Sequence, residues 1–267
     1  LPSEFQQYLP GHGDIILAEA IQRAQENGTK IVMDVKMVRE PTRIPPNYIA
    51  YPVPEIMEVK PETGLINDML DIDGFSRQYS IAGYMPHDPD VAYLTLGVKC
   101  VKAFLDISDD AVLFFNADSL MWNFGPLKIS SYGRTNNFLV NYYGPPSGYR
   151  IPGRPDLKPW GTYPRYSFSQ ILDTQDYDLP EDTDWMSNFL PGQIPDWVLA
   201  IENEAERNEM MVMMGSGSEF DITQSPFYNK IVILGVSVEV LHDVKSTPFY
   251  NYLDLSQLTP GMETHAN

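Results

Sequence analysis

A stretch near the C-terminus, Asn229–Val244 (NKIVILGVSVEVLHDV), most constrains what this chain can fold into. Five apolar side chains in it recur at every second position, namely Val232, Leu234, Val236, Val238 and Val240. This period of two is typical of a half-buried β-strand. Because a strand of that length needs a partner from far back in the chain, the pattern predicts a largely β, non-local fold.

A second long strand is expected over Val91–Ile107. Its alternating positions first place one apolar set on a face, namely Ala92, Leu94, Leu96, Val98 and Cys100. After Cys100 the alternating apolar residues are at odd-numbered positions instead, namely Val101, Ala103 and Leu105. A shift of parity by one residue predicts a β-bulge near Cys100–Val101.

One helix is well marked, over Asp14–Asn27. Asp14 is placed to cap its start, and Gly28 is placed to end it. Thr29–Arg39 then alternates between apolar and polar residues, which predicts a strand. Shorter strands are expected at Val53–Lys60, Phe75–Tyr84, Ala111–Asn116, Leu127–Tyr132 and Asn136–Tyr143, with turn residues at Asn123–Pro126 and Gly133-Arg134.

Prolines gather in two further segments. Glu40–Pro54 holds five of them, which predicts an extended arm or a loop over the surface. Gly144–Pro195 combines nine prolines with Trp160, Trp185 and many other aromatic residues. Because aromatic side chains need burial, we expect an ordered excursion or contact arm rather than a flexible linker. A second helix is expected over Asp196–Glu209, and a turn or hinge at Ser216–Ser218.

These elements together predict a mainly β fold. Two credible helices are too few for a parallel α/β sheet, which needs a helix between most strands. We therefore expect an antiparallel β-sandwich or jelly roll with an N-terminal helix, a Pro-rich arm and a long loop-rich insertion. The expected parts are an N-terminal helix, strand and arm (1–60), a first part of the sandwich (61–143), the excursion (144–195), and a helix with the completing strands (196–267).

The net charge of −18, from 36 acidic and 18 basic residues, limits the partners of the chain. An acidic surface repels the phosphates of nucleic acids and the head groups of anionic lipids, so direct binding of nucleic acid is not expected. No run of 18 apolar residues exists, which predicts no membrane-spanning segment.

Two acidic clusters are candidate metal or acid–base sites. His87 lies beside Asp88 and Asp90, but Pro86 and Pro89 favour a polar turn between strands there. The carboxylates of Asp68, Asp71 and Asp73 precede Gly74 and resemble part of a calcium loop. An EF-hand would need further oxygen ligands where Met69 and Ser80 stand, so an acidic turn is the favoured interpretation, with an irregular calcium site as the alternative.

Other candidate catalytic residues lack a supporting pattern. Cys100, the single cysteine, is expected to be a buried, unreactive thiol. Ser216 does not lie in the G-x-S-x-G pattern of esterases. A carboxylate pair for glycoside hydrolysis could be drawn from Glu55, Glu58, Asp118 and Glu239. No dinucleotide or phosphate-binding motif occurs. We therefore predict no catalytic, cofactor-binding or metal-binding residues, no cofactor and no enzymatic activity.

The five segments Asp14–Asn27, Glu40–Pro54, Val91–Ile107, Gly144–Pro195 and Asn229–Val244 together give the chain a general outline. In this outline it resembles the jelly-roll capsid proteins of icosahedral viruses, including membrane-containing ones. The resemblance implies a shell subunit of a virion, acting through contacts with copies of itself and with other virion proteins. Contact with an internal viral membrane would be compatible with its acidity.

Two other functions stay open. The first is a carbohydrate-binding or glycan-cleaving β-sandwich that uses aromatic residues around Trp160, Tyr163 and Trp185. The second is another assembly or adhesion module, such as a tail or spike component. The capsid interpretation is the hypothesis preferred from the sequence.

Overall fold

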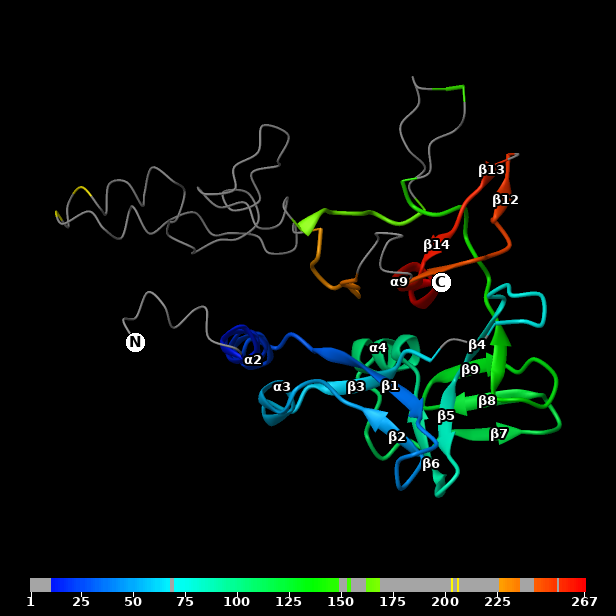
Figure 1. Cartoon of the computed structure of the whole chain (residues 1–267), viewed down its shortest axis with the longest axis horizontal. Coiled ribbons are helices and arrows are strands. Elements are labelled where there is room, and N and C mark those ends of the chain that lie inside the picture. The colour runs from blue at the N-terminus through cyan, green and yellow to red at the C-terminus, as the bar shows by residue number, and fades with distance from the viewer. Residues whose placement is uncertain are drawn as a thin grey trace. The chain divides into compact units, whose positions relative to one another are not determined.

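A computed structural model describes residues 11–67, 70–148, 153–154, 162–168, 203, 206, 226–235, 243–253 and 255–267. Backbone packing divides the chain into two compact units, Leu1–Trp160 with Ile233–Asn267, and Gly161–Val232. All helices and strands named below belong to the first unit. Its architecture is mixed α/β, with several small sheets and an N-terminal helix (Figure 1).

The N-terminal helix is confirmed as α2, His12–Glu26. Ala18 and Ile21 are its buried residues. Gly28 follows its end with φ 84°, a left-handed conformation that glycine adopts without strain. The N-cap is Gly11 and not, as predicted, Asp14. Asp14 lies in the first turn, where its negative charge interacts favourably with the positive end of the helix dipole.

The central sheet has three strands in the order β2-β1-β3. The predicted strand at Thr29–Arg39 is confirmed as β1, Val32–Arg39. Inside the expected Pro-rich arm, β2 (Asn47–Ala50) pairs antiparallel with β1, so part of that arm is a hairpin. On the other side of β1, β3 (Glu62–Leu65) runs parallel to it.

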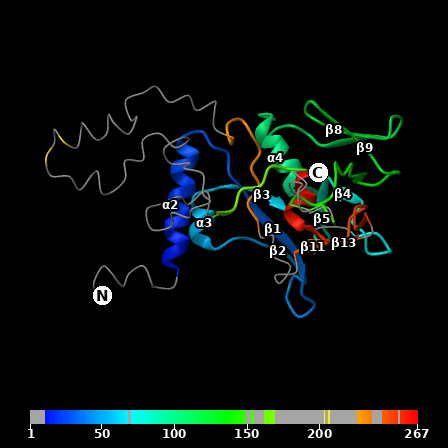
Figure 2. The ribbon, with the colours of Figure 1, turned by 90° about the horizontal axis from the view of Figure 1, so that it is seen from above.

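The crossover between β2 and β3 contains α3, Pro54–Glu58, which lies beside α2 (Figure 2). The strand predicted at Val53–Lys60 is therefore wrong. Pro54 stands at the first helical position, where its fixed φ suits a helix and its missing N–H costs nothing. Ile56 is the buried residue of this short helix.

The long strand predicted at Val91–Ile107 is also wrong. Its first part belongs to β6 (Asp88–Leu94), which pairs with β5 (Ala82–Met85), and its second part is the helix α4 (Leu96–Phe104). The parity shift at Cys100–Val101 is thus the helical periodicity of α4 and not a bulge. Leu65 and Thr95 form a parallel bridge that joins β3 to the chain just before α4.

A three-stranded antiparallel meander follows α4. It comprises β7 (Phe114–Asn116), β8 (Met121–Phe124) and β9 (Leu127–Ser130). β8 was not predicted, because Asn123 and Phe124, which are its last two residues, were assigned to a turn. Beside the meander, β4 (Gln78–Ser80) pairs with β10 (Asn137–Leu139), so the strands expected in these regions form but are short. The core cluster of this region is Ile81, Val98, Ile107 and Phe124.

The C-terminal region contains two short antiparallel pairs and a last helix. β11 (Val244–Lys245) pairs with β14 (Thr259–Pro260), β12 (Asn251–Tyr252) pairs with β13 (Leu255–Ser256), and α9 is Gly261–Ala266.

The long strand predicted at Asn229–Val244 is absent from residues 229–235. Residues 236–242 lie outside the described ones. Val232 and Leu234, which were expected on the buried face, are 50% and 76% exposed. Alternation alone therefore did not indicate burial here.

The described residues form no β-sandwich and no jelly roll. Each of their sheets has two or three strands, and most pairings join neighbours in the sequence. The helix predicted at Asp196–Glu209, the turn at Ser216–Ser218 and most of the Gly144–Pro195 excursion lie outside the described residues. The four-part division of the chain stays a prediction.

Candidate functional site

A pocket lies at the carboxyl ends of the parallel strands β1 and β3, with a volume of about 390 Å³. Its lining comprises Met37, Val38, Arg39, Asn47, Leu65, Asn67, Ser80, Ala82, Gly83, Thr95 and Asn136. Parallel strands often place ligands beyond their carboxyl ends, because the loops that follow diverge there. We call this cavity the amide pocket, after its three asparagines.

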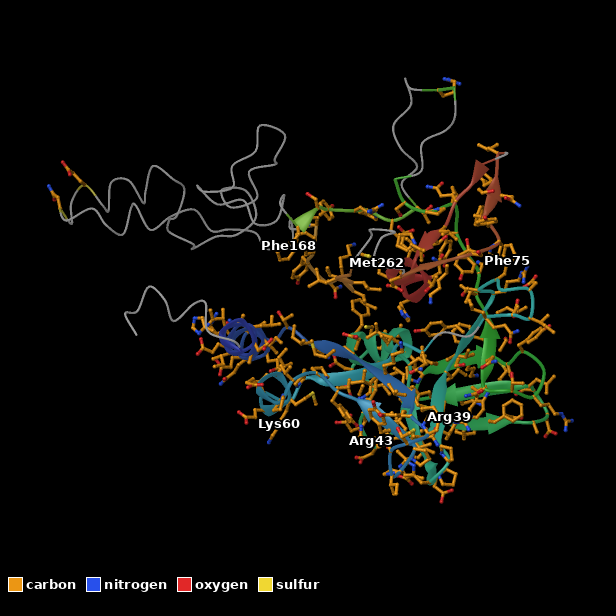
Figure 3. All side chains as sticks on the ribbon, in the orientation of Figure 1. Arg39, Arg43, Lys60, Phe75, Phe168 and Met262 are labelled. Carbon is orange, nitrogen blue, oxygen red and sulfur yellow. The ribbon has the colours of Figure 1, made fainter. Side chains whose placement is uncertain are left out.

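One wall of the amide pocket is the end of β1, where Met37, Val38 and Arg39 line it. Val35, Met37 and Arg39 share one face of this strand because side chains alternate along it. Val35 is only 4% exposed, Met37 is half-buried and Arg39 is exposed at the end of the strand (Figure 3). The buried stripe of β1 therefore continues directly into the rim of the pocket.

The side chain of Asn67 closes the gap where β3 has ended. The backbone N–H of Met37 donates to Asn67 Oδ1 at 2.6 Å, and Asn67 Nδ2 donates to the carbonyl of Met37 at 2.9 Å. The amide thus continues the hydrogen bonding of β3 along β1 by one further residue. This pair of bonds fixes the backbone of Met37 at the pocket wall.

The opposite wall comes from β4, β5 and the residue before α4. Thr95, which is 2% exposed, donates its hydroxyl hydrogen to the carbonyls of Ser80 (2.7 Å) and Ile81 (3.2 Å). Asn136 Nδ2 donates to the carbonyl of Ala82, and Ser80 Oγ donates to Asn137 Oδ1 at 2.8 Å. The polar groups of this wall are therefore held in fixed positions.

Gly83 allows the two walls to approach. A Cβ at this position would lie 2.6 Å from Leu65 Cδ1 and 3.0 Å from Met37 Cε. Real Cβ atoms do not tolerate the shorter of these contacts, so the missing side chain is what lets Leu65 and Met37 pack there.

The rim of the amide pocket carries a positive charge. Arg39 is the one charged residue of the lining, which holds no Asp or Glu. Within the described part of the chain the guanidinium of Arg39 has no hydrogen bond or ion pair. Arg43, further along the same hairpin, stacks on the ring of Tyr48 at 3.7 Å and does not line the pocket (Figure 3).

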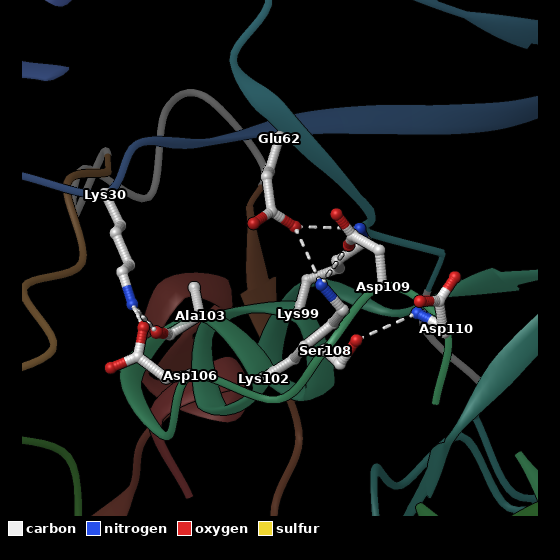
Figure 4. A network of polar contacts seen from close by, with 9 residues as sticks. All are labelled: Lys30, Glu62, Lys99, Lys102, Ala103, Asp106, Ser108, Asp109 and Asp110. Carbon is white, nitrogen blue, oxygen red and sulfur yellow. Dashed lines mark hydrogen bonds and ion pairs between the residues drawn. The ribbon is translucent and has the colours of Figure 1, made fainter. Parts of the chain in front are cut away.

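A network of ion pairs holds two pocket-lining segments together (Figure 4). Glu62 of β3 accepts from Lys99 Nζ of α4 at 2.8 Å and lies 3.7 Å from Lys102 Nζ. Lys102 Nζ also donates to Asp109 Oδ1 at 2.6 Å. Because β3 ends in Leu65 and α4 follows Thr95, this network fixes the distance between two walls of the pocket.

The charge state of this network is set by its partners. Burial disfavours the charged form of Lys102, whose side chain is 7% exposed, but the hydrogen bond to Asp109 and the charges of Glu62 and Asp109 outweigh it and raise its pKa. The hydrogen bond and charge of Lys102 in turn lower the pKa of Asp109. Both groups are therefore charged at neutral pH.

A second cavity contains two of the sequence-based candidate ligands. It has a volume of about 420 Å³ and is lined by Leu70, Asp71, Ile72, Asp73, Arg77, Gln78 and Tyr132. Arg77 donates to Asp73 through two nitrogens, both at 2.9 Å, and to Asp71 at 2.8 Å. The hydrogen bond from Arg77 is the main cause of the lowered pKa of Asp73. Asp71 and Asp73 thus bind an arginine, and Asp68 lies outside the described residues.

The other candidates are scattered. His87 lies in the turn that joins β5 to β6, whereas Asp88 and Asp90 belong to β6. Glu55 and Glu58 lie on α3, and Asp118 lies in the turn between β7 and β8. Across the described ranges, no three His, Cys, Asp or Glu side chains are grouped so that they could hold a metal ion. Glu239, Ser216, Trp160 and Trp185 lie outside those ranges.

Cys100 was expected in a strand, but it lies on the helix α4. Burial, with a smaller contribution from the charge of Glu62, raises the pKa of its thiol. A raised pKa keeps the sulfur protonated at neutral pH, which makes it a poor nucleophile. Cys100 is half-buried, so the expectation of a buried thiol was wrong, and its lack of reactivity stays a prediction.

Sequence reasoning missed the amide pocket entirely. One signal was available, because polar residues follow strand-like segments closely, Asn67 two residues after Leu65 and Thr95 directly after Leu94. Their meaning depends on β1 and β3 being parallel, and an antiparallel sandwich does not bring such positions together.

Comparison with known proteins decides the family. No curated protein and no solved structure matches the chain. The family model of the CHASE2 domain, an extracellular sensor domain of bacterial signalling proteins, matches residues 2–267. Among the helices of the described residues, none combines the length and apolar character needed to cross a bilayer.

This match overturns the interpretation drawn from the sequence. The resemblance to jelly-roll capsid proteins was wrong, as were the assignment as a shell subunit, the location in a virion and the virion partners. The error came from an architectural outline without a diagnostic motif, and two of its five segments do not have the expected structure. Because the family model covers nearly the whole sequence, the chain belongs to the CHASE2 domain family.

Proposed function

We propose that this chain is the sensing part of a membrane signalling protein, on the outer side of the membrane, and that it perceives a small molecule in the amide pocket. The observation that carries the proposal is the coincidence of two findings, a sensor-domain family and a pocket at the carboxyl ends of β1 and β3. The volume of the pocket falls within the range of about 300–1,000 Å³ that small-molecule sites usually have.

The lining supports recognition rather than catalysis. The hydroxyl hydrogens of Thr95 and Ser80 are donated to carbonyl oxygens within the protein, so neither oxygen is paired with a base that could activate it. The lining also holds no His, Cys, Asp or Glu for proton transfer. We therefore propose that the domain is not an enzyme.

The position of the pocket supports a route for the signal. Its walls come from the β1–β2 hairpin, from β3 and from the start of α4. A ligand that contacts both the hairpin and Thr95 would favour one spacing between them, which is the differential interaction that a two-state sensor needs. Thr95 directly precedes α4, so a change in its position would be passed to this helix. In the first turn of α4 the backbone N–H of Gly97 donates to the hydroxyl of Tyr79, which is also hydrogen-bonded to His265 of α9.

The test is a thermal-shift screen of the full chain against small molecules of neutral, anionic and cationic character. The wild type is compared with Asn47→Trp, which fills the pocket from its half-buried rim, and with Tyr51→Trp as a control at an exposed residue of the same segment. At least one compound is expected to raise the melting temperature of the wild type and of Tyr51→Trp but not of Asn47→Trp. If no stabilising compound loses its effect in Asn47→Trp, the pocket is not the sensing site.

A further inference from the structure

The amide pocket has a charge opposite to that of the protein around it. The chain carries 36 acidic and 18 basic residues, yet the lining contains one arginine and no carboxylate. A concave site with a fixed positive charge and no acidic group attracts anions and repels cations. The ligand would then be selected by charge before it is selected by shape.

The free polar groups of the lining point to the same class of ligand. The amide of Asn67 is bonded at both ends to Met37, and the hydroxyls of Ser80 and Thr95 already donate within the protein. Of the polar side chains that line the pocket, Arg39 and Asn47 have no hydrogen bond within the described part of the chain. Arg39 offers only donors, and Asn47 offers two donors and an acceptor.

These two residues are placed to act together. Arg39 and Asn47 are Cα partners in the antiparallel register of β1 and β2. Directly opposed residues of such a pair place their side chains on the same face, within reach of one ligand group. The planar guanidinium can donate two parallel bonds to a carboxylate or a phosphate, and the amide can donate a third.

The rest of the lining limits the size and nature of the ligand. Met37 and Val38 are the half-buried apolar residues of the lining. Leu65 and Ala82 also line the pocket but are only 2% and 1% exposed, so they belong to the core, offer almost no surface to a ligand and do not move aside easily. A volume of about 390 Å³ is near the lower end for ligand sites.

We infer that the amide pocket takes a small organic anion, whose carboxylate or phosphate binds Arg39 and Asn47 and whose short apolar body contacts Met37. This inference rests on the proposed function, because it specifies what the same pocket perceives.

The experiment compares matched compounds on the full chain by thermal shift and then by calorimetric titration. The set contains short carboxylic acids with their primary amides, and alkyl phosphates with the corresponding alcohols, together with inorganic phosphate alone. Arg39→Gln removes the charge at the rim, and Arg43→Gln removes a charge from the same hairpin without touching the pocket. Circular dichroism confirms that both variants are folded.

The anions are expected to bind and their neutral counterparts are not. Arg39→Gln should weaken the binding of the anion by about 10- to 100-fold, which is the usual effect of a bond to a charged group, whereas Arg43→Gln should leave it unchanged. Carboxylates that bind without the phosphates, or the reverse, identify the charged group.

The outcomes that contradict the inference are distinct from those that contradict the proposed function. If neutral or cationic compounds bind to the wild type and fail to bind to Asn47→Trp, the inference of an anionic ligand is refuted, whereas the pocket remains the sensing site. Anions that bind equally to Arg39→Gln would also refute it. If Asn47→Trp blocks no compound of any charge, both the inference and the proposed site are wrong.

Discussion

Asn67 binds both backbone polar groups of Met37, with Met37 N–H donating to Oδ1 at 2.6 Å and Nδ2 donating to Met37 O at 2.9 Å. A side chain therefore replaces the strand residue that β3 no longer supplies beside β1. The amide pocket depends on this replacement, because it holds Met37 in place while leaving the space beyond β3 open.

Asn67→Ala is expected to destabilise the protein by about 1–3 kcal/mol, since it leaves the half-buried N–H and carbonyl of Met37 without partners. Urea unfolding measures this change. Asn123→Ala is the control, because Asn123 makes only a 3.4 Å bond to the carbonyl of Met121 two residues away. Equal effects of the two substitutions would show that the bonds to Met37 do not stabilise the strand.

Gly64→Ala should destabilise the protein more than an ordinary surface change. Its Cβ would lie 2.6 Å from the backbone Cα of Leu96, at the start of α4, so β3 and α4 would have to separate. Overpacking of this kind costs about 1–3 kcal/mol or more.

Gly13→Ala provides the matched comparison for Gly64→Ala. Gly13 lies in α2 with nothing within 4 Å of its Cβ position, so alanine should stabilise the helix by about 0.5–1 kcal/mol. Thermal unfolding of the two variants should move the melting temperature in opposite directions. A tolerated Gly64→Ala would mean that β3 and α4 do not pack so closely.

Tyr79→Phe tests the link between α9 and α4. The hydroxyl of Tyr79 lies 2.6 Å from Nδ1 of His265 and accepts the backbone N–H of Gly97 at 3.2 Å. Because Tyr79 is 6% exposed, removal of its hydroxyl takes away the acceptor of the half-buried Gly97 N–H, at a cost of about 1–3 kcal/mol. Hydrogen exchange should then show faster exchange at Gly97. Unchanged exchange there would contradict the link.

Acid should weaken the protein through two aspartates. Hydrogen bonds from Arg77 to Asp73, and from Lys102 to Asp109, lower the pKa values of both carboxyls in the folded state. The stability that these groups contribute is fully present above the ordinary aspartate pKa of about 3.9, and it is lost as the pH falls through the lowered values. Asp73→Asn and Asp109→Asn together should flatten the decline in melting temperature below about pH 4. A decline as steep as that of the wild type would assign the acid sensitivity to other groups.

The local elements that carry their own start and stop signals could be predicted from the sequence. The helix His12–Glu26 and the strand Val32–Arg39 are examples, because Gly28 separates two different periodicities. Leu96–Phe104 could not be distinguished from a strand, since its β-branched and apolar residues satisfy both periods over a short window. The close approach of Gly64 to Leu96, which links this segment to β3, is a tertiary contact that no local pattern contains.

The candidate site was beyond the reach of sequence patterns for a different reason. Its lining comes from segments between Met37 and Asn136, and it is brought together by the parallel pairing of β1 with β3. None of its residues belongs to a motif. Arg39 stands out only once the structure shows that it lacks a partner among the described residues, whereas Arg77, which is similar in the sequence, is paired with Asp71 and Asp73.

The most direct test of the central claim is an NMR titration of the isotope-labelled full chain with the compound that stabilises it most. The amide signals that shift are expected to gather around Met37, Leu65, Ala82 and Thr95, because these residues line the amide pocket. Shifts that instead gather around Asp71, Asp73 and Arg77, at the second cavity, would contradict the claim that the amide pocket is where this CHASE2 domain perceives its signal.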